Sequence, residues 1–231
     1  MVMSRIESSS LDEYPLLATL SPARRRSLLD TARLRRFKRG EVLFHKDDPG
    51  DSLFLIQSGE VKLVLPGLDG KEKLLRVLTA GDVLGEMAII DGAPRSATAV
   101  AVKATTTLSL RRDVFIEALT AEPGAALRLC AILAEKLRLT TEALEDATFL
   151  DVPGRLAKVL LDLASRNGVK QPDGTVRVEL TLTQQELADM IGGTRARVNE
   201  HLQSFARLGW LQLDRNAVTL VKPAMLRRRC E

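Results

Sequence analysis

The stretch TLTQQELADMIGGTRARVNEHL, residues 181–202, decides the fold of the C-terminal third of the chain. Thr183 is followed three residues later by Glu186, which matches a capping box, so a helix is predicted to begin here. This helix is expected to end near Gly192-Gly193, and Thr194 is placed to cap a second one. A helix, a glycine turn and a second helix in this order predict a helix-turn-helix.

The residues around this motif complete a winged domain. The second helix is expected to end near Leu208, and two short β-rich runs follow it at Trp210–Leu213 and Ala217–Val221. Upstream, a helix is predicted over residues 153–166 and a strand over residues 175–180. Together these elements indicate a winged helix-turn-helix.

The charge of the chain is unevenly distributed. Residues 1–150 carry 21 Lys+Arg and 21 Asp+Glu, whereas residues 151–231 carry 13 and 9, so the whole net charge of +4 lies in the last third. A basic module beside a neutral one indicates a polyanion as partner of the basic part. Random scatter of surface charge gives the same count, and charge alone does not choose between the two.

The first half of the chain has a different sequence pattern. From about residue 33, short β-rich runs alternate with glycine-containing turn signals, which is typical of a small all-β barrel or sandwich. The runs that we expect to be strands are 53–59, 60–66, 73–79, 97–104 and 106–112.

Residues 122–149 are predicted to form one long helix. Small and apolar residues recur along it at alternating spacings of four and three, which is a heptad seam. Such a seam favours pairing with a second copy of the chain, because its small and polar members would pack poorly as a single core stripe; the alternative is a helix packed only on its own barrel. The seam residues are Ala126, Cys130, Leu133, Leu137, Thr140, Leu144 and Ala147.

The long helix is expected to stop at a hinge. Pro153 cannot continue it, and Asp151 can cap the helix that follows. We therefore expect an α+β protein with a β-barrel at residues 1–121, a long helix and hinge at 122–150, and the DNA-binding domain at 151–231. The hinge residues are Phe149, Leu150, Asp151, Val152 and Pro153.

The segment GEMAIIDGAPRSA, residues 85–97, carries the chemistry of the first half. Gly85 lets a backbone approach a ligand, while the guanidinium of Arg95 and the hydroxyl of Ser96 suit a phosphate. Glu86 repels a phosphate, and its carboxylate suits a ribose hydroxyl instead. A plain surface turn with an Arg–Glu pair is the other interpretation of this segment.

This segment resembles the phosphate-binding cassette of cyclic-nucleotide-binding domains, and the chain as a whole is similar to the cyclic-AMP receptor protein (CRP/FNR-type) family of bacterial transcription regulators. The resemblance implies a jelly-roll barrel, a dimerisation helix and a winged helix-turn-helix. It implies cAMP, or cGMP, as effector and no other cofactor. It also implies that ligand binding resets the hinge of a homodimer. The implied ligand-binding residues are Gly85, Glu86, Met87, Ala88, Arg95, Ser96, Thr140 and Thr141, with one of the two threonines reaching the ligand of the partner subunit.

The resemblance further implies near-palindromic double-stranded DNA and RNA polymerase as partners. Arg195 matches the guanine-reading arginine of the family. Thr183, Gln185 and Thr194 are expected to meet backbone phosphates at helix N-termini. The family pattern is broken at Ala196, which suits a thymine methyl group, and at Glu200, which suits a cytosine amine, while Arg197 and Asn199 are candidates for other contacts.

Several function classes are disfavoured. No nucleophile–base pair or paired catalytic carboxylates stand out, and two histidines and two cysteines make a metal centre unexpected, so we expect no enzyme and no metal. No apolar run reaches the length of a membrane span, and the first ten residues lack a signal-peptide core, so a cytoplasmic location is expected. Three alternatives stay open: a cGMP-responsive regulator, an effector-independent regulator, and a nucleotide-sensing module that acts on a protein.

Overall fold

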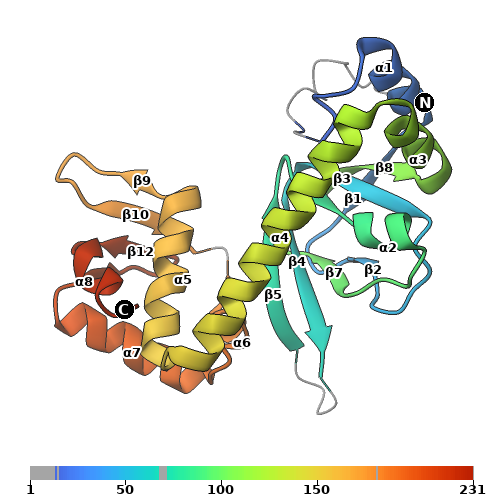
Figure 1. The fold of residues 1–231 in the computed structure, drawn as a ribbon. Coiled ribbons are helices and arrows are strands. Elements are labelled where there is room, and N and C mark those ends of the chain that lie inside the picture. Colours follow the sequence, from blue (N-terminus) through green and yellow to red (C-terminus); the bar gives the residue numbers. More distant parts are fainter. Residues whose placement is uncertain (1–13, 15, 68–71, 181, 231) are drawn as a thin grey trace. The chain divides into compact units, whose positions relative to one another are not determined.

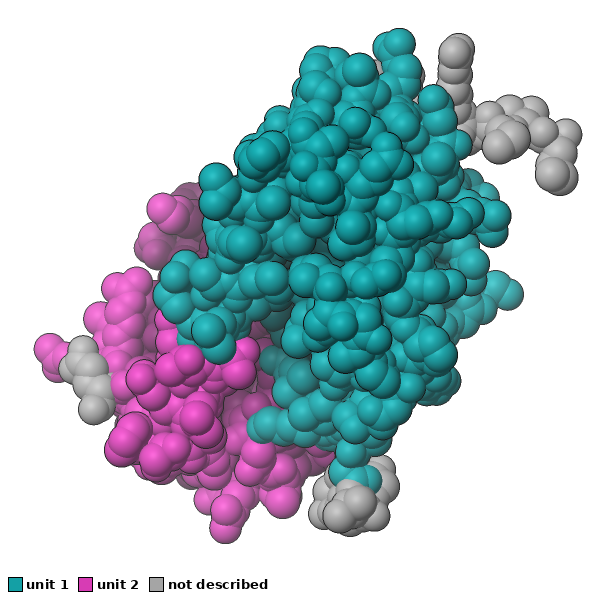
Figure 2. Space-filling view, turned by 45° about the vertical axis from the view of Figure 1, so that its right-hand side comes forward, with its two compact units in different colours: residues 1–138 teal, residues 139–231 magenta. Residues whose placement is uncertain are grey.

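The structure, a computed structural model, describes residues 14, 16–67, 72–180 and 182–230 of the 231-residue chain (Figure 1). The chain divides into two compact units, residues 1–138 and residues 139–231 (Figure 2). The outermost residues of the expected domains, at positions 1 and 231, lie outside the described part.

The long helix predicted over residues 122–149 is present as α4, Pro123–Phe149. Its first turns pack in the first unit and its last turns belong to the second, because the division of the chain falls after Arg138. One uninterrupted helix therefore contributes residues to both compact units.

Two four-stranded antiparallel sheets form the body of the first unit. Their strand orders are β1-β8-β3-β6 and β2-β7-β4-β5, so strands far apart in the sequence lie side by side, as in a jelly roll. The predicted β-barrel is confirmed. The strands are β1 (Arg33–Phe37), β2 (Val42–Phe44), β3 (Ser52–Ser58), β4 (Glu60–Pro66), β5 (Glu72–Thr79), β6 (Val83–Leu84), β7 (Thr98–Ala101) and β8 (Thr105–Arg111).

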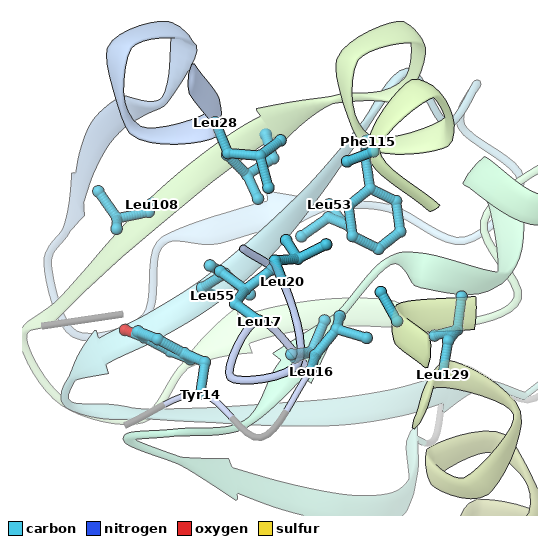
Figure 3. Packing of buried hydrophobic residues seen from close by; sticks show 14 of the residues in the cluster. Tyr14, Leu16, Leu17, Leu20, Leu28, Leu53, Leu55, Leu108, Phe115 and Leu129 are labelled. Atoms are coloured by element: carbon cyan, nitrogen blue, oxygen red, sulfur yellow. The ribbon is translucent and has the colours of Figure 1, made fainter. Parts of the chain in front are cut away.

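Strand β3 is buried on both faces, which explains its continuous apolar run Leu53–Ile56. Leu53 and Leu55 point to one side, where they join Phe115 and other residues of the helical layer (Figure 3). Phe54 and Ile56 alternate with them and join the cluster between the two sheets. The sheet that contains β3 is thus the middle layer of the unit.

Helices α1 (Pro22–Thr31), α3 (Arg112–Ala121) and the first turns of α4 form the outer layer. The sequence Ser21-Pro22 is typical of a helix start, with Ser as N-cap and Pro in the first turn. Ser21 does cap α1, since its side chain accepts a hydrogen bond from the backbone N–H of Arg24. The Ser21 hydroxyl also donates to Glu122, 2.5 Å away, which joins the start of α1 to the end of α3. The phenol of Tyr14 donates to the carbonyl oxygen of Ile56 over 3.0 Å and closes this layer onto β3.

The second unit contains the predicted winged helix-turn-helix. A four-stranded sheet of order β11-β12-β10-β9 packs with four helices and the end of α4. The capping box of Thr183 and Glu186 is present in full. The elements are α5 (Val152–Asn167), β9 (Val169–Lys170), β10 (Val176–Glu179), α6 (Gln184–Ile191), α7 (Arg195–Arg207), β11 (Leu211–Leu213), β12 (Ala217–Leu220) and α8 (Pro223–Arg227).

Candidate ligand-binding cassette and nucleic-acid interface

The segment Gly85–Ala97, called the cassette below, connects β6 to β7 in the first unit. Gly85 caps the short helix α2 (Glu86–Asp91) with φ +82°, and Gly92 ends this helix with φ +73°. Both angles lie in the left-handed region that glycine adopts without cost. The two glycines therefore place the short helix α2, of six residues, between two sharp bends.

Arg95 is buried within the cassette, with 3% of its surface exposed. Its Nη1 donates to the carbonyl oxygen of Gly85 over 2.8 Å and its Nη2 donates to that of Ser52 over 2.6 Å. The guanidinium carbon lies 4.4 Å from the ring centre of Phe44, a cation–π distance. The Nε atom is buried and has no hydrogen-bond partner among the described residues.

Burial lowers the pKa of Arg95, because the charged form is the one that loses solvation. The carboxylates of Asp51, Glu86 and Asp48 oppose this effect. Arginine titrates so far above neutrality that the group remains a cation. The cassette thus holds a permanent positive charge whose buried Nε donor has no partner among the described residues.

The backbone approaches Arg95 closely where glycine stands. A Cβ atom on Gly85 would lie 2.4 Å from Nη1 of Arg95, and one on Gly50 would lie 2.3 Å from the Cβ of Ala88. Neither separation is possible without a shift of the neighbouring atoms. Gly50 was not singled out from the sequence, although its position in Pro49-Gly50-Asp51 marks it as a turn.

Glu86 is also buried, with 3% of its surface exposed. Its Oε1 accepts a hydrogen bond from Nζ of Lys136 on α4 over 2.7 Å. The same ammonium donates to the carbonyl oxygen of Val83 over 3.0 Å. Lys136 therefore joins the long helix to the cassette inside the first unit, a role that sequence reasoning missed. Its position one helical turn before Thr140 is the signal that could have found it.

The remaining residues of the expected ligand site are arranged around these two buried groups. Ala88 is buried, whereas Met87 and Ser96 are exposed, and the Ser96 hydroxyl lies 3.8 Å from the sulfur of Met87. Thr140 and Thr141 lie on α4 beyond Arg138, in the second unit, and both side chains are exposed. The structure thus brings together Gly85, Glu86, Met87, Ala88, Arg95 and Ser96 in one unit.

The helix-turn-helix separates a buried face from an exposed one. Val198, Leu202 and Phe205 of α7 are buried, and Phe205 stacks on Trp210 with ring centres 5.3 Å apart. Thr194 caps α7 by accepting from the backbone N–H of Arg197. The exposed residues of α7 include all of its expected DNA contacts, namely Arg195, Ala196, Arg197, Asn199 and Glu200.

All three expected phosphate contacts already have partners within the chain, Thr194 through its cap of α7. The Thr183 hydroxyl accepts from the backbone N–H of Glu186 in the capping box. The Gln185 amide donates to Asp189 over 2.8 Å. Both side chains are exposed at the start of α6, so these contacts stabilise the end of the helix that faces solvent.

Two cations contact the expected hinge, Phe149–Pro153, and a third contacts the last turns of α4 just before it. Arg155 donates from Nη1 to the carbonyl oxygen of Leu150 over 2.5 Å and from Nε to that of Ile191 over 2.7 Å. Lys158 pairs with Asp146 at 2.7 Å, and Arg229, just after α8, pairs with Asp151. Sequence reasoning predicted the Asp151 cap, which the N–H of Gly154 completes at 2.9 Å, but not these cations.

The expected seam of α4 is largely exposed in the single chain. Leu137 and Leu144 have 68% and 67% of their surfaces exposed, and Cys130, Thr140 and Ala147 are exposed as well. Ala126 and Leu133 are half-buried against the first unit. Two leucines this exposed on one helix face are unusual for a surface that meets only water.

The described residues form neither a membrane-spanning helix nor a cluster of metal ligands. None of the helices in the described ranges is long and apolar enough to cross a bilayer. Within those ranges, no three side chains of His, Cys, Asp or Glu gather as metal ligands.

Comparison with known proteins assigns both units to families. Residues 34–122 match the cyclic nucleotide-binding domain, and residues 154–229 match the Crp-like helix-turn-helix domain. A "CRP-like cAMP-activated global transcriptional regulator" of Mycobacterium tuberculosis is 39% identical over 193 residues, which cover 84% of this chain and 86% of that protein. The "Cyclic AMP receptor protein" of Thermus thermophilus is 32% identical over 212 residues, covering 92% and 94%.

Among solved structures, FixK2 from Bradyrhizobium japonicum superposes with a TM-score of 0.78 over 87% of this chain and 98% of that chain, at 20% identity, which supports the fold alone. A cyclic-nucleotide-binding barrel and a winged helix-turn-helix on one chain define a class of DNA-binding transcription regulators. The chain belongs to the CRP/FNR family of these regulators.

The close approach at Gly85 predicts a steric effect that can be separated from backbone strain. Gly40 has φ +83°, but a Cβ there would meet nothing within 4 Å. Gly40→Ala should therefore cost only the left-handed strain, about 1 kcal/mol, whereas Gly85→Ala should cost roughly 1–3 kcal/mol more because Arg95 is displaced. Urea unfolding followed by circular dichroism measures both. Equal losses in the two variants would contradict the predicted clash.

The contacts of Asp151 predict a pH dependence for the second unit. Burial raises the pKa of Asp151, but the N–H of Gly154 and the charge of Arg229 outweigh it, so the net pKa is lowered. A lowered folded-state pKa gives stability that is present above the unfolded-state pKa, about 3.9, and is lost as the pH falls through the folded value. Asp151→Asn should be less stable than the parent at pH 7, and the difference should shrink as the pH falls below about 3.9. Urea unfolding followed by fluorescence of Trp210, the sole tryptophan, tests this; a gap that persists unchanged at pH 3 would contradict it.

Proposed function

We propose that this protein is a homodimeric transcription regulator that binds a cyclic nucleotide, with cAMP favoured, in its N-terminal unit. The observation that carries the proposal is the buried Arg95 cation with an unpartnered Nε, in the same cassette as the buried carboxylate of Glu86. A buried donor without an acceptor costs free energy, and a phosphate oxygen would supply that acceptor. The preference for cAMP rests on the names of the relatives from Mycobacterium tuberculosis and Thermus thermophilus.

The proposed ligand contacts follow the chemistry of each group. Arg95 and Ser96 take the cyclic phosphate, and Gly85 and Glu86 take the ribose. Met87 and Ala88 lie on the same cassette, and Thr140 and Thr141 contact the purine, one of them across the dimer. Binding is proposed to act through α4 on the segment Phe149–Pro153, and the protein acts by binding rather than by catalysis.

An effector-independent regulator of the same family is the second candidate. It is favoured by the pairing of Glu86 with Lys136 and by the carbonyl partners of Arg95, because these contacts stabilise the cassette within the chain itself. A ligand that uses Glu86 has to compete with Lys136.

The proposed partner of the second unit is near-palindromic double-stranded DNA, with RNA polymerase as a further partner. Arg195 is proposed to read guanine, Ala196 a thymine methyl group and Glu200 a cytosine amine, with Arg197 and Asn199 making other contacts. Thr183, Gln185 and Thr194 are proposed to meet phosphates, since all three lie at the N-terminal ends of α6 and α7.

Calorimetric titration of the purified protein with cAMP, and separately with cGMP, tests the effector. We expect micromolar binding of one nucleotide, lost in Arg95→Ala and weakened about tenfold in Ser96→Ala, where one hydrogen bond to a charged group is removed. Arg111→Ala is the matched control, because Arg111 is exposed and pairs only with Asp113 among the described residues.

The exposed Ser96 keeps the test informative if Arg95→Ala fails to fold. Binding of neither nucleotide by the parent protein would favour the effector-independent regulator. Undiminished binding by both cassette variants would contradict the proposed phosphate site.

Dimerisation along α4 is proposed because a second chain would bury the exposed apolar side chains of the seam. A second copy of the same helix supplies an identical apolar face, and heptad spacing lets two such helices interlock over their length. Lys136 faces the cassette while Leu137 is exposed, so α4 is able to bind its own barrel on one side and a partner on the other.

Leu137→Glu should convert the dimer to a monomer, because two like charges would meet inside an apolar seam. Leu208→Glu is the control, since Leu208 is also exposed but lies at the end of α7. Sedimentation velocity measures the result. A parent protein that is monomeric, or a Leu137→Glu variant that remains fully dimeric, would overturn the assignment of the seam.

A further inference from the structure

A hollow lies on the exposed side of the helix-turn-helix, lined by Gln184, Arg195, Ala196 and Asn199. Gln184 is the first residue of α6, and the other three lie on the first two turns of α7 (Figure 1). Across this hollow the amide nitrogen of Gln184 donates to Oδ1 of Asn199 over 3.5 Å. The two amides therefore form a polar couple that bridges the two helices next to Arg195.

We propose that this couple selects adenine at one position of the DNA half-site, with Asn199 as the residue that reads the base and Gln184 as its positioning residue. The inference rests on the proposed DNA-binding function and deepens it. It concerns a base that the family resemblance does not assign, because the resemblance gives a guanine to Arg195 and nothing definite to Asn199.

The chemistry of the amide favours adenine. In the major groove, adenine presents the N6 amine as donor and N7 as acceptor, and a carboxamide matches both at once. A carbonyl oxygen has two lone pairs, so Oδ1 of Asn199 is able to accept from Gln184 and from N6 together. With the Asn199 amide placed so that Oδ1 accepts from Gln184, Nδ2 is left to donate to N7. No other hydrogen bond of the Asn199 side chain occurs within the described ranges.

The spacing of α7 places this base relative to the guanine. Arg195 and Asn199 are four residues apart and share one face of the helix, so they are separated by about 6 Å along its axis. Base pairs repeat every ~3.4 Å. A helix that lies along the groove therefore carries Asn199 to a base pair one or two steps from the guanine.

The surroundings leave both groups available to DNA. Arg195 has no carboxylate partner among the residues that the structure describes, so its guanidinium is not engaged in an ion pair. Val198 and Leu202 follow Arg195 and Asn199 by three residues each, so they flank the same side of α7, and both are buried, which fixes the rotation of the helix. Arg195 and Asn199 thus belong to a rigid surface rather than to a loop.

The test is selection of binding sites by the full-length protein from duplexes with a randomised inverted repeat, with saturating cAMP and, separately, without nucleotide. The parent protein should select a guanine and, one or two base pairs away, an adenine favoured over other bases by about 5- to 150-fold. Asn199→Ala should lose the adenine preference and keep the guanine. Asn199→Asp should shift that position toward cytosine, because a carboxylate accepts from the cytosine amine but cannot donate to N7.

Gln184→Ala should lower the adenine preference without changing the guanine preference or the melting temperature, which separates positioning from a structural role. Gln203→Ala is the control, because Gln203 is exposed on α7 but lies outside the hollow. Arg195→Ala should lose the guanine and keep the adenine.

The outcomes separate this inference from the proposed function. If the parent selects no motif at all, the proposed DNA-binding function fails. If the parent selects a motif whose guanine depends on Arg195, but Asn199→Ala leaves every position unchanged, only the adenine assignment is overturned. If Asn199→Ala instead loses the preference at a position where the parent selects a base other than adenine, the assignment of adenine is overturned as well.

Discussion

The burial of the Arg95 guanidinium is the constraint on which the cassette depends. A buried cation is costly unless hydrogen bonds and nearby charge compensate it. Here the compensation comes from two main-chain carbonyl groups, those of Gly85 and Ser52, and from the ring of Phe44. The Gly85 carbonyl is presented by a left-handed residue at the start of α2, and the Ser52 carbonyl by the first residue of β3. The position of Arg95 therefore fixes how the short helix meets the middle sheet.

A second buried charge, the carboxylate of Glu86, connects the same segment to α4. Glu86 lies one residue after Gly85, and its partner Lys136 comes from the long helix rather than from the barrel. A ligand changes a conformational equilibrium only through its different affinity for the two states. Under the proposed function, a ribose hydroxyl that donates to the Glu86 carboxylate alters the contact that holds α4 to the cassette. The ion pair is thus the described contact through which ligand chemistry reaches the helix.

The sequence predicts this fold well where a local rule decides the structure. The capping box at Thr183, the cap at Ser21 and the heptad run of α4 each depend on residues within a few positions of one another. The strands predicted from apolar runs are β3, β4, β5, β7 and β8, while β1, β2 and β6 were not recognised. RLRRF in β1 looks polar because four of its five residues face solvent, and β2 and β6 have three and two residues, too few to show a period.

The candidate site likewise contains residues that the sequence identifies and contact partners that it does not. Arg95 and Glu86 were recognisable from the sequence because charged residues in a short glycine-containing segment, within an otherwise apolar region, indicate a binding role. Their partners were not, because Lys136 is 50 residues from Glu86, and Ser52 is 43 residues from Arg95. Contacts at that separation depend on how layers pack, which no local pattern encodes. The same holds for Arg229, which reaches Asp151 from 78 residues away.

The contacts of Arg155 and Lys158 at the end of α4 decide which residues move together with the second unit. Arg155 holds the carbonyl of Leu150 and that of Ile191 with one guanidinium, so the segment Phe149–Pro153 and the end of α6 share a single anchor. Lys158 binds the last turns of α4 through Asp146. Burial alone would lower the pKa of this lysine, but Asp146 outweighs it, so the pKa is raised and Lys158 stays a cation at neutral pH. Any rearrangement that keeps these contacts carries the segment along with the helix-turn-helix as one body. The end of α4, the segment Phe149–Pro153 and the start of α5 are therefore held together within the second unit.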